Sequence, residues 1–307
     1  MTNPVILSLG EVLWDLFPEG PRFGGAPANF ACHAAALGAK VSMVSAVGDD
    51  PRGREAIKIL RGFGIDTSLI QVIADAQTGT VGVSLDAKSK PIFTIHEGSA
   101  WDRVDWTPGI AERITEVDAV YFGTLGQRSE VSKESIRRAL DMAKTKEIPR
   151  VLDINLRKPF FDTVLIRESV EITSVLKLSD DELEQVATAC GIRTNHDYDT
   201  TLRALLERFD LDLVVMTKGA DGAILVAPGK TVDQAGIPTD VRDTVGAGDA
   251  FIASLVVGML RGEPLEKLAH DACETAAAVC AQVGAVPGFP GDRRMSGGDL
   301  PLINDGK

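Results

Sequence analysis

The chain has 307 residues, enough for one large α/β domain with an extension or for two smaller domains, and its 44% hydrophobic content supports a sizeable core. No apolar run approaches the ~20 residues of a membrane span, and the N-terminus carries no basic signal segment, so we expect a soluble, cytoplasmic protein. The formal net charge of −12, from 32 Lys and Arg against 44 Asp and Glu, argues against nucleic acid or an anionic membrane surface as a partner.

The cysteines and histidines do not form a metal-binding pattern. No CxxC pair occurs, and the cysteines stand in mostly apolar, helix-like surroundings, which predicts reduced buried thiols rather than disulfides or zinc ligands. The four histidines are scattered along the chain, so we expect no histidine metal centre and no histidine triad. The four cysteines are Cys32, Cys190, Cys273 and Cys280.

The first 75 residues alternate between strand and helix patterns. An apolar run at 4–9, ended by Gly10, predicts a buried strand of a parallel sheet. A helix at 26–37, a strand at 41–47, a helix at 51–62 and a strand at 70–73 follow. This order predicts a parallel sheet covered by helices.

The glycine-rich segment before the first helix is a second point of interest. Gly24 and Gly25 precede Ala26-Pro27-Ala28-Asn29, where the helix begins. Backbone groups or Asn29 could bind a small polar ligand here, and a tight loop with a closely packed small-residue helix explains the same residues.

The alternation stops between residues 78 and 102. Two runs rich in β formers, 80–85 and 91–96, have no helix between them and predict a hairpin outside the main sheet, to which residues 11–23 add strands. Trp101 could face a ligand from this region, although a buried anchoring role is the more frequent one for such an aromatic residue.

The second half returns to the α/β pattern. The predicted strands are 119–122, 150–154, 170–176 and 212–216, with an antiparallel pair at 223–226 and 230–234. The predicted helices are 133–144, one that begins at Ser179, and 265–283. Ser179 followed by Glu182 is a complete capping box by itself. From Gly284 the chain is rich in Gly and Pro, and we expect it to wrap the surface.

A phosphate-binding pattern lies at 243–249. Gly246, Ala247 and Gly248 lead directly into an apolar helix, whose first N–H groups lack helical acceptors and carry the positive end of the helix dipole. Asp249 in the first turn would repel phosphate, so it needs a role. It could accept the proton of an attacking hydroxyl group, or it could simply cap the helix, and this motif alone does not decide between the two.

Several motifs together resemble the ribokinase-like carbohydrate kinases, the phosphofructokinase-B family. Residues 24–29, 38–39 and 48–53 are similar to one family signature, and residues 243–249 to the other. Three further landmarks occur in the family's order at 153–157, 177–182 and 217–222, so the resemblance spans the chain. The pairing of 24–29 with 153–157 looks most like the fructokinase branch.

This resemblance implies a fold and an activity. The expected fold is α/β and ribokinase-like, with a central, mostly parallel sheet, helices on both faces and a small β-sheet lid. Residues 1–10, 25–77 and 104–307 would form the large domain, and residues 11–24 and 78–103 the lid. The expected activity is ATP-dependent phosphorylation of a sugar hydroxyl with Mg²⁺, in a protein that could dimerise through its lid.

The resemblance also implies roles for single residues. Asp249 would be the catalytic base and Gly246, Ala247 and Gly248 the anion hole. The sugar would be held by Asp15, Gly24, Gly25, Asn29 and Arg157. The nucleotide would be bound by Lys177, Ser179, Glu182, Thr217, Lys218, Gly219, Gly222, Thr244 and Cys273, with Glu182 as a possible Mg²⁺ contact. A monovalent cation such as K⁺ would lie near Asp243 and Val245.

Two positions depart from the family pattern. Ser179 stands where the family usually has asparagine, so the phosphate and Mg²⁺ contacts would be rearranged. Gly288 stands where a serine cation ligand is common, which puts activation by K⁺ in doubt.

Three alternatives to a fructokinase stay open at this point. The first is a kinase of the same family for 2-keto-3-deoxygluconate, ribose, a nucleoside or another hexose, with the choice made by lid residues such as Phe23, Phe93, Ile95 and Trp101. The second is a binding protein without activity on the same fold, against which the intact Asp249 argues. The third is a dinucleotide-dependent oxidoreductase, which the GxGxxF spacing far from the first strand makes a poor fit.

Overall fold

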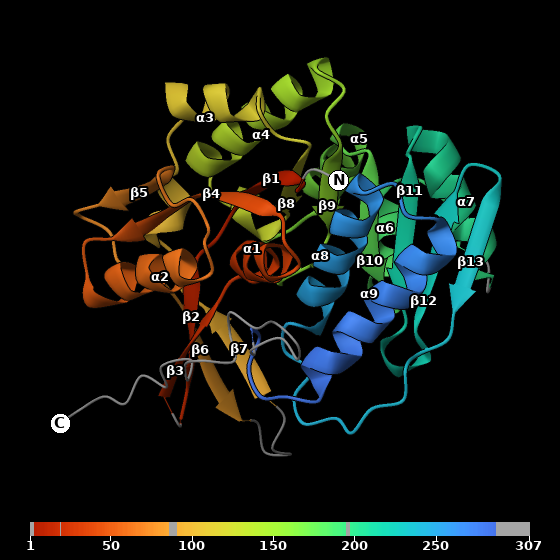
Figure 1. The fold of residues 1–307 in the computed structure, drawn as a ribbon. Coiled ribbons are helices and arrows are strands. Elements are labelled where there is room, and N and C mark those ends of the chain that lie inside the picture. The colour runs from red at the N-terminus through yellow and green to blue at the C-terminus, as the bar shows by residue number, and fades with distance from the viewer. Residues whose placement is uncertain (1–2, 19, 86–90, 195–196, 287–307) are drawn as a thin grey trace.

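The computed structural model describes residues 3–18, 20–85, 91–194 and 197–286, which contain two separate sheets (Figure 1). The larger has nine strands in the order β13-β12-β11-β10-β9-β8-β1-β4-β5, all parallel except β12 and β13. Its strands are β1 Val5–Leu9, β4 Lys40–Gly48, β5 Ile70–Ile73, β8 Ala119–Gly123, β9 Arg150–Asp153, β10 Val175–Ser179, β11 Leu213–Thr217, β12 Ala223–Ala227 and β13 Lys230–Gln234. The expected mostly parallel sheet and its antiparallel pair are confirmed.

Helices cover both faces of this sheet, and each face has its own hydrophobic core. On one face pack α1 Ala26–Ala36, α2 Pro51–Gly62, α8 Ala247–Leu260 and α9 Leu265–Cys280. On the other pack α3 Pro108–Ile114, α4 Glu130–Thr145, α5 Thr163–Ile172, α6 Asp180–Ala189 and α7 Tyr198–Phe209. Because successive strand residues point to opposite faces, Ile6 joins the first core and Leu7 the second.

Strand order also predicts where a ligand can bind. The chain runs from β1 outward through β4 to β5 and then resumes on the other side of β1 with β8. In open α/β sheets, ligands bind beyond the carboxyl ends of the strands at such a switch point. Gly10 and Glu11 follow β1 directly at that edge.

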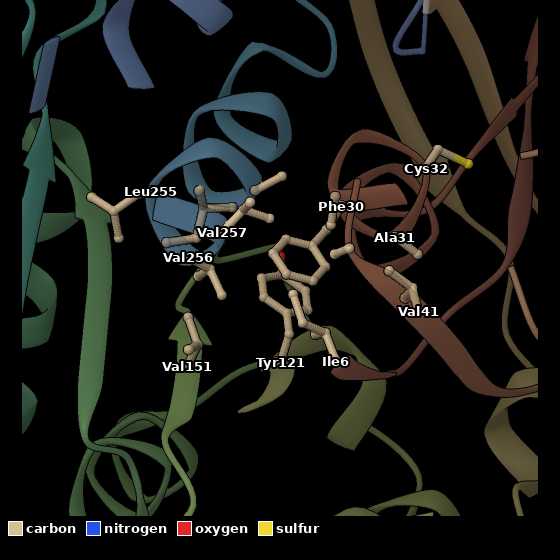
Figure 2. Packing of buried hydrophobic residues seen from close by; sticks show 14 of the residues in the cluster. Ile6, Phe30, Ala31, Cys32, Val41, Tyr121, Val151, Leu255, Val256 and Val257 are labelled. Carbon is tan, nitrogen blue, oxygen red and sulfur yellow. The ribbon is translucent and has the colours of Figure 1, made fainter. Parts of the chain in front are cut away.

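Helices α1 and α8 lie side by side over the middle of the large sheet (Figure 2). Helix α8 is apolar on all sides, as expected for a helix enclosed by α1, α9 and the sheet. The Phe30 ring of α1 stacks on the Tyr121 ring of β8, with 3.8 Å between centroids, and Val256 and Val257 of α8 pack nearby. This packing holds the middle and second half of α8 against α1 and the sheet.

The smaller sheet has the order β3-β2-β6-β7 and lies below the large one in Figure 1. Its strands are β2 Leu13–Phe17, β3 Gly20–Gly24, β6 Gly79–Leu85 and β7 Pro91–Ile95. The expected hairpin, and the strands added to it by the segment after β1, are therefore present.

One predicted strand is wrong. Residues 170–176 contain the end of α5 and the start of β10 instead. Asp162 caps α5 by accepting a hydrogen bond from the Leu165 N–H. The helix buries one side, made of Leu165, Ile166, Ser169 and Val170. The apolar residues at the end of this helix have the sequence pattern of a short strand, which explains the wrong prediction. Helices α3 and α7 were also not predicted.

The last predicted helix ends at Cys280 rather than at residue 283, and the expected surface course of the C-terminal tail lies mostly outside the described residues. None of the helices in the described ranges is long and apolar enough to cross a membrane. Of the cysteines, Cys32, Cys190 and Cys273 are buried and Cys280 is half-buried, and all four are free.

Candidate active site

Two cavities meet at the beginning of α8. The first, of about 530 Å³, lies between the small sheet and the carboxyl ends of the large-sheet strands. The second, of about 520 Å³, lies between the loop after β11, the segment 236–241 and α9. Both are lined by Thr244 and Gly248, so a molecule in one cavity can approach a molecule in the other at this helix end.

The phosphate-binding geometry expected at 243–249 is present. Gly246 precedes α8 with φ 81°, a left-handed conformation that favours glycine, and a Cβ there would collide with the Ala285 carbonyl oxygen. Within the described part of the chain, the N–H groups of Gly248 and Asp249 have no backbone acceptor. These two donors and the helix dipole can therefore bind an anion between the cavities.

Asp249 lines the first cavity, and Asn29 Nδ2 donates to its Oδ2 over 2.8 Å. Loss of hydration, and next the charge of Asp153, raise the pKa of Asp249 to about 7, against the lowering effects of Asn29, Lys177 and Arg157. A carboxylate with a pKa close to neutral is well suited to accept a proton at physiological pH. A role for Asp249 as a helix cap alone does not explain why its side chain lines the cavity.

Two further carboxylates of the site were missed as functional residues. Glu11 follows β1, and burial raises its pKa to about 7, with Asp249 as a further cause. Its Oε2 is buried without a hydrogen-bond partner among the described residues. Asp153 ends β9 and accepts two hydrogen bonds from Lys177 Nζ at 2.9 and 3.0 Å. A charged residue at the end of an apolar strand, or within two residues of it, was the signal for both.

The sugar-side residues expected from the resemblance mostly line the first cavity. Asp15, Gly25, Asn29 and Arg157 do so, and Gly24 lies behind Asp15, close to its carboxylate. Burial raises the pKa of Asp15 to about 6, while Arg157 and Arg22 lower it. The neighbouring Asn155, which also lines the cavity, has φ 40°, uncommon for a residue with a side chain.

Two of the aromatic residues expected to select the substrate, Phe23 and Trp101, do not line this cavity. Phe23 packs edge-on against Trp14, with centroids 5.9 Å apart. Trp101 is buried, with the Arg128 guanidinium 3.9 Å above its ring, so the anchoring interpretation of this residue is correct. Ile95 does line the cavity, and the Phe93 side chain lies outside the described residues.

The second cavity contains most of the expected nucleotide residues. It is mainly apolar in its inner part, where Phe251, Ala276 and Ala277 contribute, as an adenine ring requires. The expected residues that line it are Thr217, Gly219, Gly222, Thr244 and Cys273, together with Ala247 and Gly248 of the anion hole.

Four expected nucleotide residues do not line the second cavity. Ser179 and Glu182 form the capping box of α6, and Glu182 also accepts from the Leu156 N–H at 2.7 Å. Lys218 forms an ion pair with Asp233 at 2.7 Å. Lys177 lines the first cavity rather than the second.

The residues do not offer a preformed metal site. Both Glu182 oxygens already accept hydrogen bonds, so direct coordination of Mg²⁺ by this carboxylate does not fit the arrangement. The described ranges contain no cluster of three or more His, Cys, Asp or Glu side chains able to hold a metal ion.

Asp243, expected beside a monovalent cation, holds the loop together. Its carboxylate accepts from the N–H groups of Val245 at 3.1 Å and Gly284 at 3.0 Å. Arg22 of β3 lies 3.5 Å away and already supplies a positive charge from the small sheet. Gly288, the other position relevant to a cation, lies outside the described residues.

Comparisons with known proteins identify the family of the chain. The family model described as pfkB family carbohydrate kinase matches residues 20–291. A fructokinase of Escherichia coli is 27% identical over 82% of this chain and 83% of its own, and a 2-dehydro-3-deoxygalactonokinase of Haloferax volcanii is 27% identical over 97% and 98%. The crystal structure of a sugar kinase from Pyrococcus horikoshii in complex with ATP superposes with a TM-score of 0.78, at 27% identity, over 92% of this chain and 94% of that one.

Proposed function

Because the chain belongs to the pfkB family of carbohydrate kinases, we propose that it transfers the γ-phosphoryl group of MgATP to a primary hydroxyl group of a neutral sugar, with fructose as the first candidate. The observation that carries this proposal is the position of Asp249, which lines the first cavity directly after Gly248, a residue that lines both cavities. The sugar would bind in the first cavity, beside Asp15 and Asn29, and the nucleotide in the second. An oxidoreductase is inconsistent with this family.

The reaction follows from these positions. The sugar oxygen attacks the γ-phosphorus in line, its proton passes to Asp249, and the bond from phosphorus to the bridging oxygen of ADP breaks. The N–H groups at the start of α8 stabilise the charge on the phosphoryl oxygens. The small sheet would act as a lid that keeps water, a competing acceptor, away from the phosphoryl group.

The charges of the first cavity favour a neutral sugar over a sugar acid. Four carboxyl groups line it, from Glu11, Asp15, Asp153 and Asp249, and Lys177 is already paired with Asp153. Carboxylates accept hydrogen bonds from sugar hydroxyls but repel a substrate carboxylate. Arg157 forms no ion pair with the described residues, so it is the group that a sugar acid would use.

The test is an ADP-release screen over fructose, ribose, 2-keto-3-deoxygluconate, tagatose-6-phosphate and adenosine. We expect the strongest signal with fructose, and a marked loss of kcat/KM for it in Asp15→Asn. If the protein phosphorylates only 2-keto-3-deoxygluconate, and Arg157→Gln abolishes that activity, the substrate is a sugar acid and not fructose. Sugar binding without any ADP release would favour a binding protein.

Other parts of the sequence interpretation stay predictions. They are the cytoplasmic location, the absence of nucleic-acid and membrane partners, a homodimer formed through the lid, and the use of Mg²⁺. No step of the proposed reaction uses K⁺, because Arg22 and two backbone N–H groups already contact Asp243.

A further inference from the structure

His33 is a fully buried histidine of α1 whose ring contacts the segment that follows α9. The residue is 0% exposed, and the other buried residues of this helix, apart from Asn29, are apolar. Burial removes a polar ring from water, so a buried imidazole needs hydrogen-bond partners inside the protein. One of these partners is the Ala285 carbonyl oxygen, which lies 2.9 Å from Nε2.

The direction of this hydrogen bond follows from the charge of the ring. Burial lowers the pKa of His33 to about 4, against the opposing effect of the Ala285 carbonyl, so the ring is neutral near pH 7. A carbonyl oxygen can only accept, so Nε2 carries the proton and donates to it. Because the ring stays neutral, this contact does not change over the pH range in which Asp249 titrates.

Ala285 is in turn packed against the loop that forms the anion hole. A Cβ on Gly246 would lie 2.3 Å from the Ala285 carbonyl oxygen and 2.6 Å from its Cα, so the backbones of the two residues are in close contact. The preceding Gly284 N–H donates to Asp243 Oδ2, in the same loop, over 3.0 Å. The two residues that cover the loop are thus held by Asp243 on one side and by His33 of α1 on the other.

We propose that His33 is a positioning residue for the anion hole: it holds Ala285 against Gly246 and so keeps the N–H groups at the start of α8 directed at the transferred phosphoryl group. This rests on the proposed kinase function and adds to it a residue that lines neither cavity. Asn29 and His33 are four positions apart and therefore lie on one face of α1. That face fixes the base through Asn29 and the anion hole through His33.

Two substitutions separate the hydrogen bond from the packing of the ring. His33→Leu fills the space with an apolar side chain and removes the donor, whereas the amide of His33→Gln can still donate to Ala285. Cys32→Ala is the matched control, because Cys32 is a buried neighbour on α1 whose side chain points away from α8 (Figure 2). It should lower the Tm through the loss of a buried group, without a change at Ala285.

Hydrogen exchange of backbone amides tests the positioning without any substrate. The amides of Val245 and Gly284, which donate to Asp243, should exchange about tenfold faster in His33→Leu, because the covering segment is no longer held. His33→Gln should restore slow exchange, and Cys32→Ala should leave it unchanged. Unchanged exchange in His33→Leu would overturn the inference, whatever the activity of the protein.

Turnover tests the consequence for the reaction, with the sugar that gives the strongest ADP release. In His33→Leu kcat should fall about tenfold, less than the ~10²–10³ for complete loss of one anion-hole donor, with the KM for the sugar changed by less than about twofold. His33→Gln should recover most of kcat. An unchanged kcat in His33→Leu, or equal losses in His33→Leu and Cys32→Ala, would exclude a role of His33 in the reaction.

A double variant shows whether His33 acts through Gly246. In His33→Leu with Gly246→Ala the loss of kcat should be smaller than the product of the two single losses, because both changes disturb the same contact with Ala285. A loss equal to that product would overturn the proposed route. If the wild-type protein releases no ADP with any of the sugars, the proposed kinase function fails instead, and the exchange experiment alone decides whether His33 positions the loop.

Discussion

Asn29 Nδ2 donates a hydrogen bond to Asp249 Oδ2 over 2.8 Å and so joins two residues 220 positions apart in the sequence. Asn29 lies in the first turn of α1, where the sugar is expected, and Asp249 in the first turn of α8, where the phosphate is expected. The hydrogen bond fixes the proposed base between the two substrates. It also contributes to the pKa of that base.

Replacement of Asp249 by asparagine should strongly reduce turnover and spare nucleotide binding. Asparagine keeps the size of the side chain but cannot accept the hydroxyl proton, so we expect kcat to fall by about 10²–10⁴. Because the pKa of Asp249 is about 7, wild-type kcat/KM should fall as the pH decreases below that value. ADP release measured from pH 5.5 to 9, with ATP affinity as the control, checks both. Near-normal turnover in the variant would exclude Asp249 as the base.

Removal of the Asn29 amide should move the pH profile. The hydrogen bond from Asn29 stabilises the ionised form of Asp249 and lowers its pKa, so Asn29→Ala should raise it. The fall of kcat/KM on the acidic side of the pH profile should therefore begin at higher pH. The KM for the sugar should also rise, because Asn29 is expected to contact the sugar. An unchanged acidic side of the profile together with a raised KM would show that Asn29 acts on the sugar only.

Asp249 should also make the stability of the fold depend on pH. Its folded pKa of about 7 is raised above the ordinary value of 3.8, so its contribution to stability is fully present below pH 3.8 and is lost as the pH rises through 7. Asp249→Asn removes this loss. We expect the variant to be more stable than wild type at pH 8 by a few kcal/mol in urea unfolding, with a smaller difference at pH 5. Equal stabilities at pH 8 would contradict the raised pKa.

The two ends of α8 provide a matched pair of glycine variants. Gly246 and Gly262 have similar positive φ angles, 81° and 73°, but a Cβ at Gly246 would collide with the Ala285 carbonyl, whereas one at Gly262 has no heavy atom within 4 Å. Gly262→Ala should cost about 1 kcal/mol of stability from backbone strain alone. Gly246→Ala should in addition displace the N–H groups of the anion hole and lower kcat by about 10²-fold. Equal kcat in both variants would mean that Gly246 serves the fold and not the site.

Local patterns predicted most of the strands and the glycine-rich start of α8. The run before Gly10 and the Gly-x-Gly segment before α8 carry their signals within a few residues, and the family motifs added the positions of Asp15 and Asn29. The failure at 170–176 has a local cause too, because a short apolar run at the end of a helix has no period that separates it from a strand.

The missed residues depend on long-range placement. Glu11 and Asp153 become site residues only because β1 pairs with β8, β8 with β9, and β9 with β10, which brings the ends of these strands to one edge. Trp101 and Phe23 could not be placed for the same reason. Their neighbours Arg128 and Trp14 are known only from the fold.

The separation of Asn29 from Asp249 also sets the order in which the site is made in the cell. The ribosome adds about 5–20 residues per second, so Asp249 is synthesised on the order of 10–40 s after Asn29, the residue that donates to it. Until then the nascent chain has Asn29, where the sugar is expected, without the helix at which the phosphate is expected. A prematurely terminated chain that ends before residue 246 would therefore be inert toward ATP, and could not consume it wastefully while it awaits degradation.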